Sequence, residues 1–346
     1  GLAIDYDGSR TNFPSSANYG VSEYCADVVE GIMQVCNQAE VPHPVIISES
    51  GRALIGYYSV LLMNVLDTAQ LGVQALPENL PDPLPPPLAN MLDAARSLRT
   101  KNLQGYFNDA IYYRDEVHAA FDHGQISLRQ RAQGDQIFWY ILTRIAAEMH
   151  KLKIVPEELR ELPNLMADVY YCNFSVFQSL PDAWAIEQLF PIMPIHRLNQ
   201  KPTRHAYLSD ITCDCDGKID RFIDLHDVSS TLPVHSFERG DEYVLGAFLV
   251  GAYQETLGDL HNLFGDTNVV SIRVDEDGEI EYVEEVDGDS VGDVLSYVEY
   301  NPARLTEQFR TLAEEAVKHK RITPTERREV LANFEAGLRG YTYFEN

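Results

Sequence analysis

The first part of the chain changes from helical to strand-like hydrophobic spacing. Apolar side chains recur at steps of three and four between residues 21 and 40, which predicts an amphipathic helix. Val45–Ile47 follow as an apolar triplet after two prolines, and such a triplet is typical of a short strand buried in a parallel α/β sheet. The polar segment Ser48–Arg52 comes next, at the carboxyl end of that strand, where α/β folds place their sites.

The pattern changes again after a second apolar run at residues 58–68. Residues 77–87 hold six prolines in eleven positions, which predicts an extended linker. From about residue 88 to residue 155, apolar positions at helical spacing predict three helices. This segment is expected to be a helical bundle inserted into another domain.

Strand-like spacing returns after Pro163 and predicts a β-domain. Its β-rich segments are residues 169–177, 204–211, 243–250, 269–274 and 280–283. Asp275–Gly278 is a hairpin turn between the last two. Two or three helices are expected after Pro302, with a further boundary near Pro324. The expected fold class is therefore α/β plus β, with an inserted helical bundle and C-terminal helices.

The charge of the chain restricts its partners. A net charge of −26 argues against nucleic acids and anionic membranes, and it suits cationic small molecules. No apolar run is long enough for a membrane-spanning helix. The five cysteines are too few and too scattered for a disulfide framework, so we expect a reducing, cytoplasmic location.

Cys213–Gly217, which reads Cys-Asp-Cys-Asp-Gly, is the most unusual polar segment. A zinc site usually needs four ligands, and this lone Cys-x-Cys has no second cysteine pair. A calcium loop with its glycine at Gly217 would need acids where Thr212 and Ile223 stand. No metal is therefore expected here. An ordinary polar turn and a proton donor beside a cationic substrate both remain open.

Two further segments each allow a structural and a functional interpretation. Glu49 either pairs with a neighbouring charge or keeps a cofactor's pyridine nitrogen protonated, with Gly51 and Arg52 contacting its phosphate. Tyr253 is either a packed aromatic ring or a hydroxyl that contacts the same phosphate. Taken alone, the residues favour the packed ring for Tyr253 and leave both interpretations of Glu49 open.

The order of these segments is more specific than any one of them. The chain resembles the alanine-racemase-like pyridoxal phosphate (PLP) decarboxylases, and within them the biosynthetic arginine decarboxylases. The segments that carry the resemblance are Gly1–Gly8, Asn18–Gly20, His43–Pro44, Ser48–Ala53, Asn173–Trp184, Asp210–Gly217, Gly251–Gly258, His261–Asp266 and Gly340–Tyr343.

The resemblance implies four structural units. Residues 1–58 would be the C-terminal part of a PLP-binding (β/α)8 barrel, and residues 59–76 with 164–300 a β-domain of barrel or sandwich type. Residues 77–163 would be the inserted bundle, and residues 301–346 the C-terminal helical segment.

The resemblance also implies an activity: conversion of L-arginine to agmatine and CO2 in polyamine and spermidine biosynthesis, with PLP and in some cases Mg2+. By resemblance, Cys213 is the catalytic cysteine, supplied across a homo-oligomer interface into the partner's site. Glu49, Gly51, Arg52 and Tyr253 would bind the cofactor. Substrate contact would come first from Asp214 and then from Asp216, as clamps for the guanidinium group.

Two features depart from the family pattern. None of the seven lysines lies in the Tyr-Pro-apolar-Lys context of the PLP lysine, so we expect a C-terminal portion that is inactive without an N-terminal barrel segment. Gly56-Tyr57-Tyr58 stands where the family typically has Ala-His-His. The alternatives are an ornithine, lysine or diaminopimelate decarboxylase of the same fold, or a non-catalytic partner subunit.

Overall fold

The computed structural model describes residues 19–49, 51–71, 75–80, 83–149, 151–224 and 228–345. Helix α1 (Val21–Gln38) confirms the first predicted helix, and the Gly20 N–H at its start donates to the Glu23 carboxylate at 2.8 Å. A short helix, α2 (Gly51–Ile55), follows an extended segment. The predicted site residue Arg52 lies in α2, but its side chain is outside the described part, as is all of Gly1–Gly8.

The predicted buried strand at Val45–Ile47 is wrong for the chain as the structure describes it. These residues are extended without strand pairing, and the side chains of Val45 and Ile47 are 88% and 90% exposed. A strand requires a hydrogen-bonded neighbour. The described residues place no strand beside this triplet, so its apolar side chains stay in solvent.

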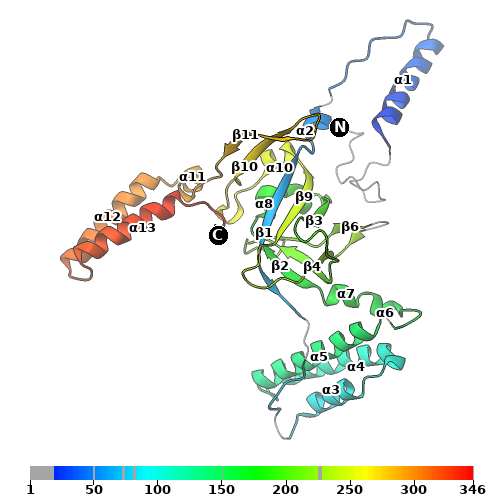
Figure 1. Ribbon diagram of the computed structural model, residues 1–346, viewed down its shortest axis with the longest axis vertical. Coiled ribbons are helices and arrows are strands. Elements are labelled where there is room, and N and C mark those ends of the chain that lie inside the picture. The colour runs from blue at the N-terminus through cyan, green and yellow to red at the C-terminus, as the bar shows by residue number, and fades with distance from the viewer. Residues whose placement is uncertain are drawn as a thin grey trace.

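The centre of the molecule is a seven-stranded sheet in the order β3-β9-β1-β2-β4-β5, with β8 also paired to β4 (Figure 1). Its strands are β1 (Ser59–Ala69), β2 (Asp168–Cys172), β3 (Ile192–Pro194), β4 (Arg204–Ser209), β5 (Lys218–Ile219), β8 (Leu232–Val234) and β9 (Val244–Val250). Strands β3 and β8 also contact each other, so the sheet curves into a nearly closed barrel.

Strands β2 and β4 are the parallel pair in this sheet, and a salt bridge joins their starts. The buried Asp168 carboxylate accepts from Arg204 Nε at 2.7 Å and from a terminal guanidinium nitrogen at 2.6 Å. This bidentate contact raises the pKa of Arg204, mainly through the hydrogen bond. The sheet encloses an apolar core that includes the fully buried Tyr170, Phe174 and Leu245.

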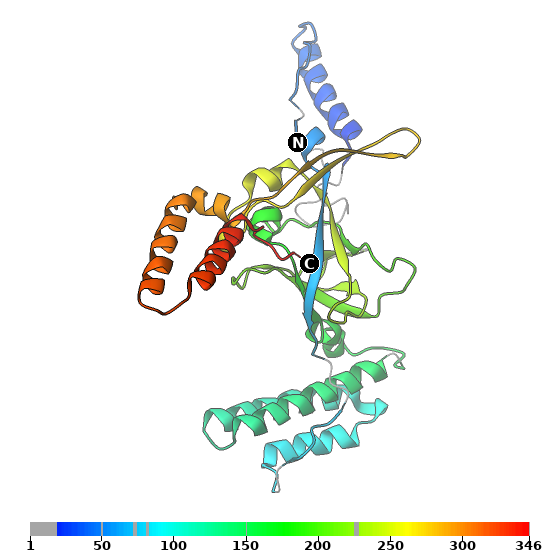
Figure 2. The same cartoon turned by 60° about the vertical axis from the view of Figure 1, so that its left-hand side comes forward.

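The helical bundle lies at one end of the sheet (Figure 2). Its long helices α3 (Pro86–Ser97), α4 (Leu103–Asp122) and α5 (Leu128–Met149) confirm the three predicted helices. The bundle also contains the 3-10 helix η1 (Thr100–Asn102) and the short helices α6 (Glu157–Arg160) and α7 (Leu162–Leu165). The bundle has a core of its own, built from side chains such as Leu88, Ile137 and Ile141.

The remaining elements are short or lie near the C-terminus. The short ones are α8 (Val176–Ser179), α9 (Pro181–Ala185), β6 (Phe222–Ile223), β7 (Val228–Ser229), α10 (Ala252–Leu257) and η2 (His261–Leu263). The C-terminal ones are the hairpin β10 (Val269–Val274) and β11 (Ile280–Val286), then α11 (Val291–Tyr297), α12 (Pro302–Lys318) and α13 (Pro324–Arg339). Helices α12 and α13 pack as a pair away from the sheet (Figure 1).

Candidate functional site

Asp210 fixes the loop that carries the predicted cysteine and aspartates between β4 and β5. This residue is 3% exposed, and its carboxylate accepts from the Val176 N–H at 2.9 Å and from the Thr212 N–H at 2.8 Å. Gly217 closes the loop, and a Cβ there would lie 2.2 Å from Asp210 Oδ1. The glycine is therefore required by the close approach of the buried carboxylate.

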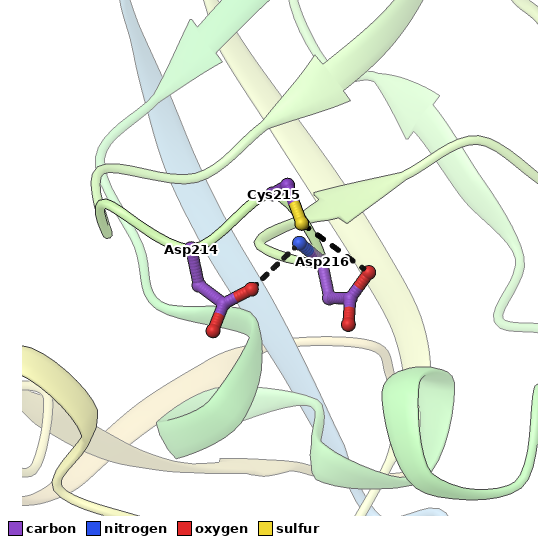
Figure 3. Close-up of side chains that lie close together, drawn as sticks. All are labelled: Asp214, Cys215 and Asp216. Atoms are coloured by element: carbon purple, nitrogen blue, oxygen red, sulfur yellow. Dashed lines mark hydrogen bonds between the residues drawn. The ribbon is translucent and has the colours of Figure 1, made fainter.

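Asp214, Cys215 and Asp216 form a compact turn in which Asp214 is half-buried and the other two residues are exposed (Figure 3). Asp214 Oδ1 accepts the Asp216 N–H at 2.9 Å, and Cys215 Sγ lies 3.9 Å from Asp216 Oδ1. One potential ligand atom from each residue lies within 4.8 Å of the others. The set does not fit magnesium, because Mg2+ prefers oxygen ligands and one of the three donors is a thiol.

Cys213 contacts the turn that follows α10. Its N–H donates to Asn262 Oδ1 at 3.0 Å, and Asn262 Nδ2 donates to Cys213 Sγ at 3.4 Å. The backbone of Asn262 has φ 57°, in the left-handed region that asparagine tolerates better than most residues. The exposed cysteine is therefore tied to a residue 49 positions further along the chain.

Asp214 faces the residue next to Asn262. His261 Nε2 lies 3.6 Å from Asp214 Oδ2, beyond hydrogen-bonding distance, and among the described residues it has no hydrogen-bond partner. The His261 ring lies against Phe177, with 4.5 Å between ring centroids. Consecutive residues 213–214 therefore face consecutive residues 261–262.

The end of α2 and the start of α10 meet at one end of β1 and β9. Ser59 pairs with Val250 across these strands, so α2 ends where α10 begins. A Cβ on Gly251 would lie 2.5 Å from the Ile55 carbonyl oxygen, which shows how closely the two segments approach. Tyr58 Oη donates to a Glu255 carboxylate oxygen at 2.8 Å across the same junction.

The predicted phosphate-binding residues Gly51 and Tyr253 lie on the two helices of this junction. Gly51 opens α2 with open space around it, and the half-buried Tyr253 lies in the first turn of α10. Backbone N–H groups at helix starts and a phenol hydroxyl are groups that hold phosphate oxygens. Glu49 lies just before α2 and is exposed. Its neighbour Ser50 is outside the described residues.

The predicted residues fall into two groups. Gly51 begins α2 and Tyr253 lies in α10, the two helices that meet at Gly251, while Cys213 and Asp214 lie against the turn at residues 261–262. That turn follows α10 closely in the chain, so α10 links the two groups. In the contacts of the described residues, Cys213 and Asp214 reach this turn and not Glu49.

The two candidate guanidinium clamps face different hollows. Asp214 lines a shallow pocket of about 360 Å³ together with Tyr171 and Tyr207. Asp216 lines a second pocket of about 260 Å³ beside Trp184. The pockets share Lys218, whose pKa is raised by its ion pair with Asp220. Only one of the two aspartates can therefore serve a given pocket.

Sequence reasoning missed the residues that support these groups. Gln254 is buried, and its amide contacts the Asp182 carboxylate at 2.7 Å and the Asp182 N–H at 3.1 Å, which fastens α10 to α9. Gln178 donates to Asp266 at 2.5 Å. Burial, then the nearby Asp289, raises the pKa of Asp266. These residues lie inside segments that carry the family resemblance, but a segment of sequence does not show which residues pair with one another.

Family models and relatives of known name both match this chain. The arginine decarboxylase helical bundle domain matches residues 81–163, and the arginine decarboxylase C-terminal helical extension matches residues 291–344. The chain is 46% identical over its full length to biosynthetic arginine decarboxylase of Thermosynechococcus vestitus, covering 54% of that protein. It is 44% identical to the enzyme of that name from Nostoc, covering 51% of it. The chain is a homologue of the biosynthetic arginine decarboxylases.

The solved structure of the biosynthetic arginine decarboxylase of Campylobacter jejuni has the same fold. The match covers 100% of this chain and 55% of the other, with a TM-score of 0.81 and 30% identity. The curled sheet, the helical bundle and the C-terminal helices are therefore shared with that arginine decarboxylase. The chain spans about half the length of the biosynthetic arginine decarboxylases that it matches.

These matches favour the arginine decarboxylases over the alternative decarboxylases of the same fold.

The helices were also compared with the requirements for spanning a membrane. In the part of the chain that the structure describes, no helix has both the length and the apolar character needed to cross a membrane.

Proposed function

We propose that this chain is the C-terminal portion of an enzyme that converts L-arginine to agmatine and CO2 with PLP, for polyamine biosynthesis in the cytoplasm. The observation that carries the proposal is the similarity to biosynthetic arginine decarboxylases over the whole of this chain. The acidic surface, with a net charge of −26, suits a cationic substrate and a cationic product.

Four residues of this chain would hold the cofactor. Gly51, Arg52 and Tyr253 would contact its phosphate at the start of α2 and α10, and Glu49 would keep its pyridine nitrogen protonated by stabilising the positive charge. PLP, when bound, supplies an electron sink for the pair left on Cα by departing CO2. None of the seven lysines has the family's PLP-lysine context, so a preceding segment would supply that lysine, and this chain alone would be inactive.

Cys213 would complete the reaction as a proton donor. The bond between Cα and the carboxylate carbon breaks, CO2 leaves, and the electron pair stays with Cα. The thiol proton of Cys213 then passes to Cα, which leaves a thiolate on the sulfur. An exposed thiol at the edge of the sheet suits delivery into the active site of a second subunit, as the family resemblance implies. The proposal therefore includes a homo-oligomer with a shared site.

Asp214 would clamp the distal guanidinium group. A carboxylate can hold the planar guanidinium through two parallel hydrogen bonds. The bond from the Asp216 N–H already orients the Asp214 carboxylate, and it leaves Oδ2 directed toward His261 rather than to a backbone donor. Asp216 is the second choice, because its carboxylate is exposed and its described contact is the distant Cys215 thiol. No step is assigned to Mg2+, because the donor set does not fit it.

The test uses the full-length enzyme and a panel of L-arginine, L-ornithine, L-lysine and diaminopimelate. We expect release of CO2 from arginine and agmatine as the product. Replacement of the pyridinium partner in Glu49→Ala should lower kcat about a thousand-fold or more, since the ring proton is lost. Glu30→Ala, an exposed glutamate in α1, is the matched control.

Three results would contradict parts of this proposal. Preference for another amino acid of the panel would reassign the substrate. Near-normal turnover of Glu49→Ala would remove that residue from the cofactor site. A full-length enzyme that binds PLP but decarboxylates none of the panel would support the non-catalytic subunit instead.

A further inference from the structure

Asn262 is linked to Cys213 through both ends of its side-chain amide. We propose that Asn262 is a positioning residue for Cys213: it sets the direction of the thiol and stabilises the thiolate left after proton transfer. This inference rests on the proposed role of Cys213 as proton donor. Nothing in the sequence pattern alone pairs these two residues, which lie in different motifs.

The geometry of the contact gives the amide two separate tasks. The carbonyl oxygen accepts the Cys213 N–H at 3.0 Å, which holds the main chain of the loop. The amide nitrogen donates to the sulfur at 3.4 Å, which selects one rotamer of the thiol. Since Cys213 is exposed, its side chain would otherwise be free to rotate.

The local backbone favours asparagine at this position. Asn262 has φ 57° and Leu263 has φ 61°, so the turn passes through the left-handed region twice. Glycine and asparagine enter that region at low cost, whereas most other residues are strained there. Asparagine is therefore suited both to the turn and to offering a donor and an acceptor at once.

The bond to sulfur matters most after the proton has left. The thiolate carries a negative charge, and a hydrogen bond from an amide N–H to a charged group is stronger than one to a neutral group. A donor held beside the sulfur therefore favours proton release toward Cα and keeps the sulfur aligned. Loss of this bond would leave Cys213 in place, but its thiol would no longer be held in one orientation toward Cα.

The experiment measures agmatine formed per CO2 released by the full-length enzyme. Each decarboxylation releases one CO2, and protonation at Cα yields one agmatine. If the proton went to another atom, the amine nitrogen would stay with the cofactor and water would release the carbon skeleton as an aldehyde, so agmatine would fall below CO2. A merely structural defect would lower both products together and leave their ratio unchanged.

Two substitutions separate the two bonds of Asn262. Asn262→Asp keeps an acceptor for the Cys213 N–H but offers no donor to sulfur. Asn262→Gly keeps the left-handed backbone and removes both bonds. We expect both to lower the ratio of agmatine to CO2, with Cα protonation slowed about five-fold or more. Cys213→Ala gives the reference value for complete loss of the donor.

Asn268→Asp is the matched control. It is the same substitution, it keeps an acceptor for the Gly288 N–H, and Asn268 has no described contact with Cys213. If Cys213→Ala lowers the ratio while both Asn262 variants keep the wild-type value, the positioning role is wrong and the proposed function stands. If Cys213→Ala also keeps the wild-type ratio, the donor role of Cys213 fails, and this inference fails with it. Absence of agmatine from the unmodified enzyme would overturn the proposed function itself.

Discussion

The carboxylates around the exposed turn differ in how firmly they are held. Asp210 is buried under three hydrogen bonds, Asp214 is oriented by one backbone N–H, and Asp216 is exposed. A buried and fully satisfied carboxylate is suited to fixing a loop. One that is oriented but open is suited to binding a cation.

Asp214→Asn tests the guanidinium clamp in the full-length enzyme. The amide can still accept the Asp216 N–H, so the turn should persist. Loss of a charge-assisted hydrogen bond, worth about 1.5–3 kcal/mol, should lower kcat/KM for arginine about ten- to hundred-fold. Steady-state kinetics with Asp216→Asn alongside is the measurement. A larger loss in Asp216→Asn than in Asp214→Asn would reverse the assignment.

Asp266 should make stability depend on pH. Burial, then Asp289, raises the pKa of its carboxyl in the folded protein, while Gln178 partly offsets this. The folded state therefore holds the proton more tightly, and stability should fall as pH rises from about 4 through the raised pKa. Asp266→Asn keeps an oxygen acceptor for Gln178 and should flatten this fall. Urea unfolding across that pH range measures it, and an unchanged slope would contradict the prediction.

At the level of elements, the junction of α2 and α10 depends on a glycine. Gly251 lies against the end of α2, and Tyr58, between α2 and β1, donates to Glu255 of α10 at 2.8 Å. Burial, then the hydrogen bond and charge of Glu255, raises the pKa of Tyr58. This bond therefore ties the segment after α2 to α10, beside the proposed phosphate-binding residues.

Gly251→Ala should weaken PLP binding. The added Cβ would lie 2.5 Å from the Ile55 carbonyl oxygen, so α2 must shift, at a cost of about 1–3 kcal/mol. We expect the full-length enzyme to bind PLP about ten-fold or more weakly in a cofactor titration. Gly337→Ala is the control, because a Cβ there meets nothing within 4 Å. Equal PLP affinity in both variants would show that the junction does not shape the phosphate site.

At the scale of the whole molecule, the described residues form two separate apolar cores. One lies inside the curled sheet and the other inside the helical bundle, and the bundle sits at one end of the sheet (Figure 2). Because the cores share none of their buried residues, a defect in one has no direct route into the packing of the other.

Ile141→Ala should therefore destabilise the bundle alone. Its side chain is fully buried, and its truncation should cost the bundle about 2–5 kcal/mol. Hydrogen exchange should speed up in α3–α5 and stay unchanged in β9. Leu245→Ala in the sheet core should give the opposite pattern. Loss of protection in both units from either substitution would show that they unfold together.

Local patterns predicted the long elements correctly. Helices α4 and α5 and strands β4 and β9 are long enough for their hydrophobic period to stand out, and Pro302 and Pro324 each begin a helix as expected. Strands β5–β7 have two residues each, and they exist because a neighbour supplies hydrogen bonds. No period can be read from two residues.

Side-chain identity and local spacing are enough to predict the long helices and strands, the family resemblance and the residues that offer chemistry. Which of those residues meet depends on the folded chain. It placed Asn262 on Cys213 and Gly251 on the end of α2, and it left Val45–Ile47 without a neighbouring strand. These outcomes depend on contacts between distant segments, and a hydrogen bond across 49 positions leaves no mark on the spacing of either segment.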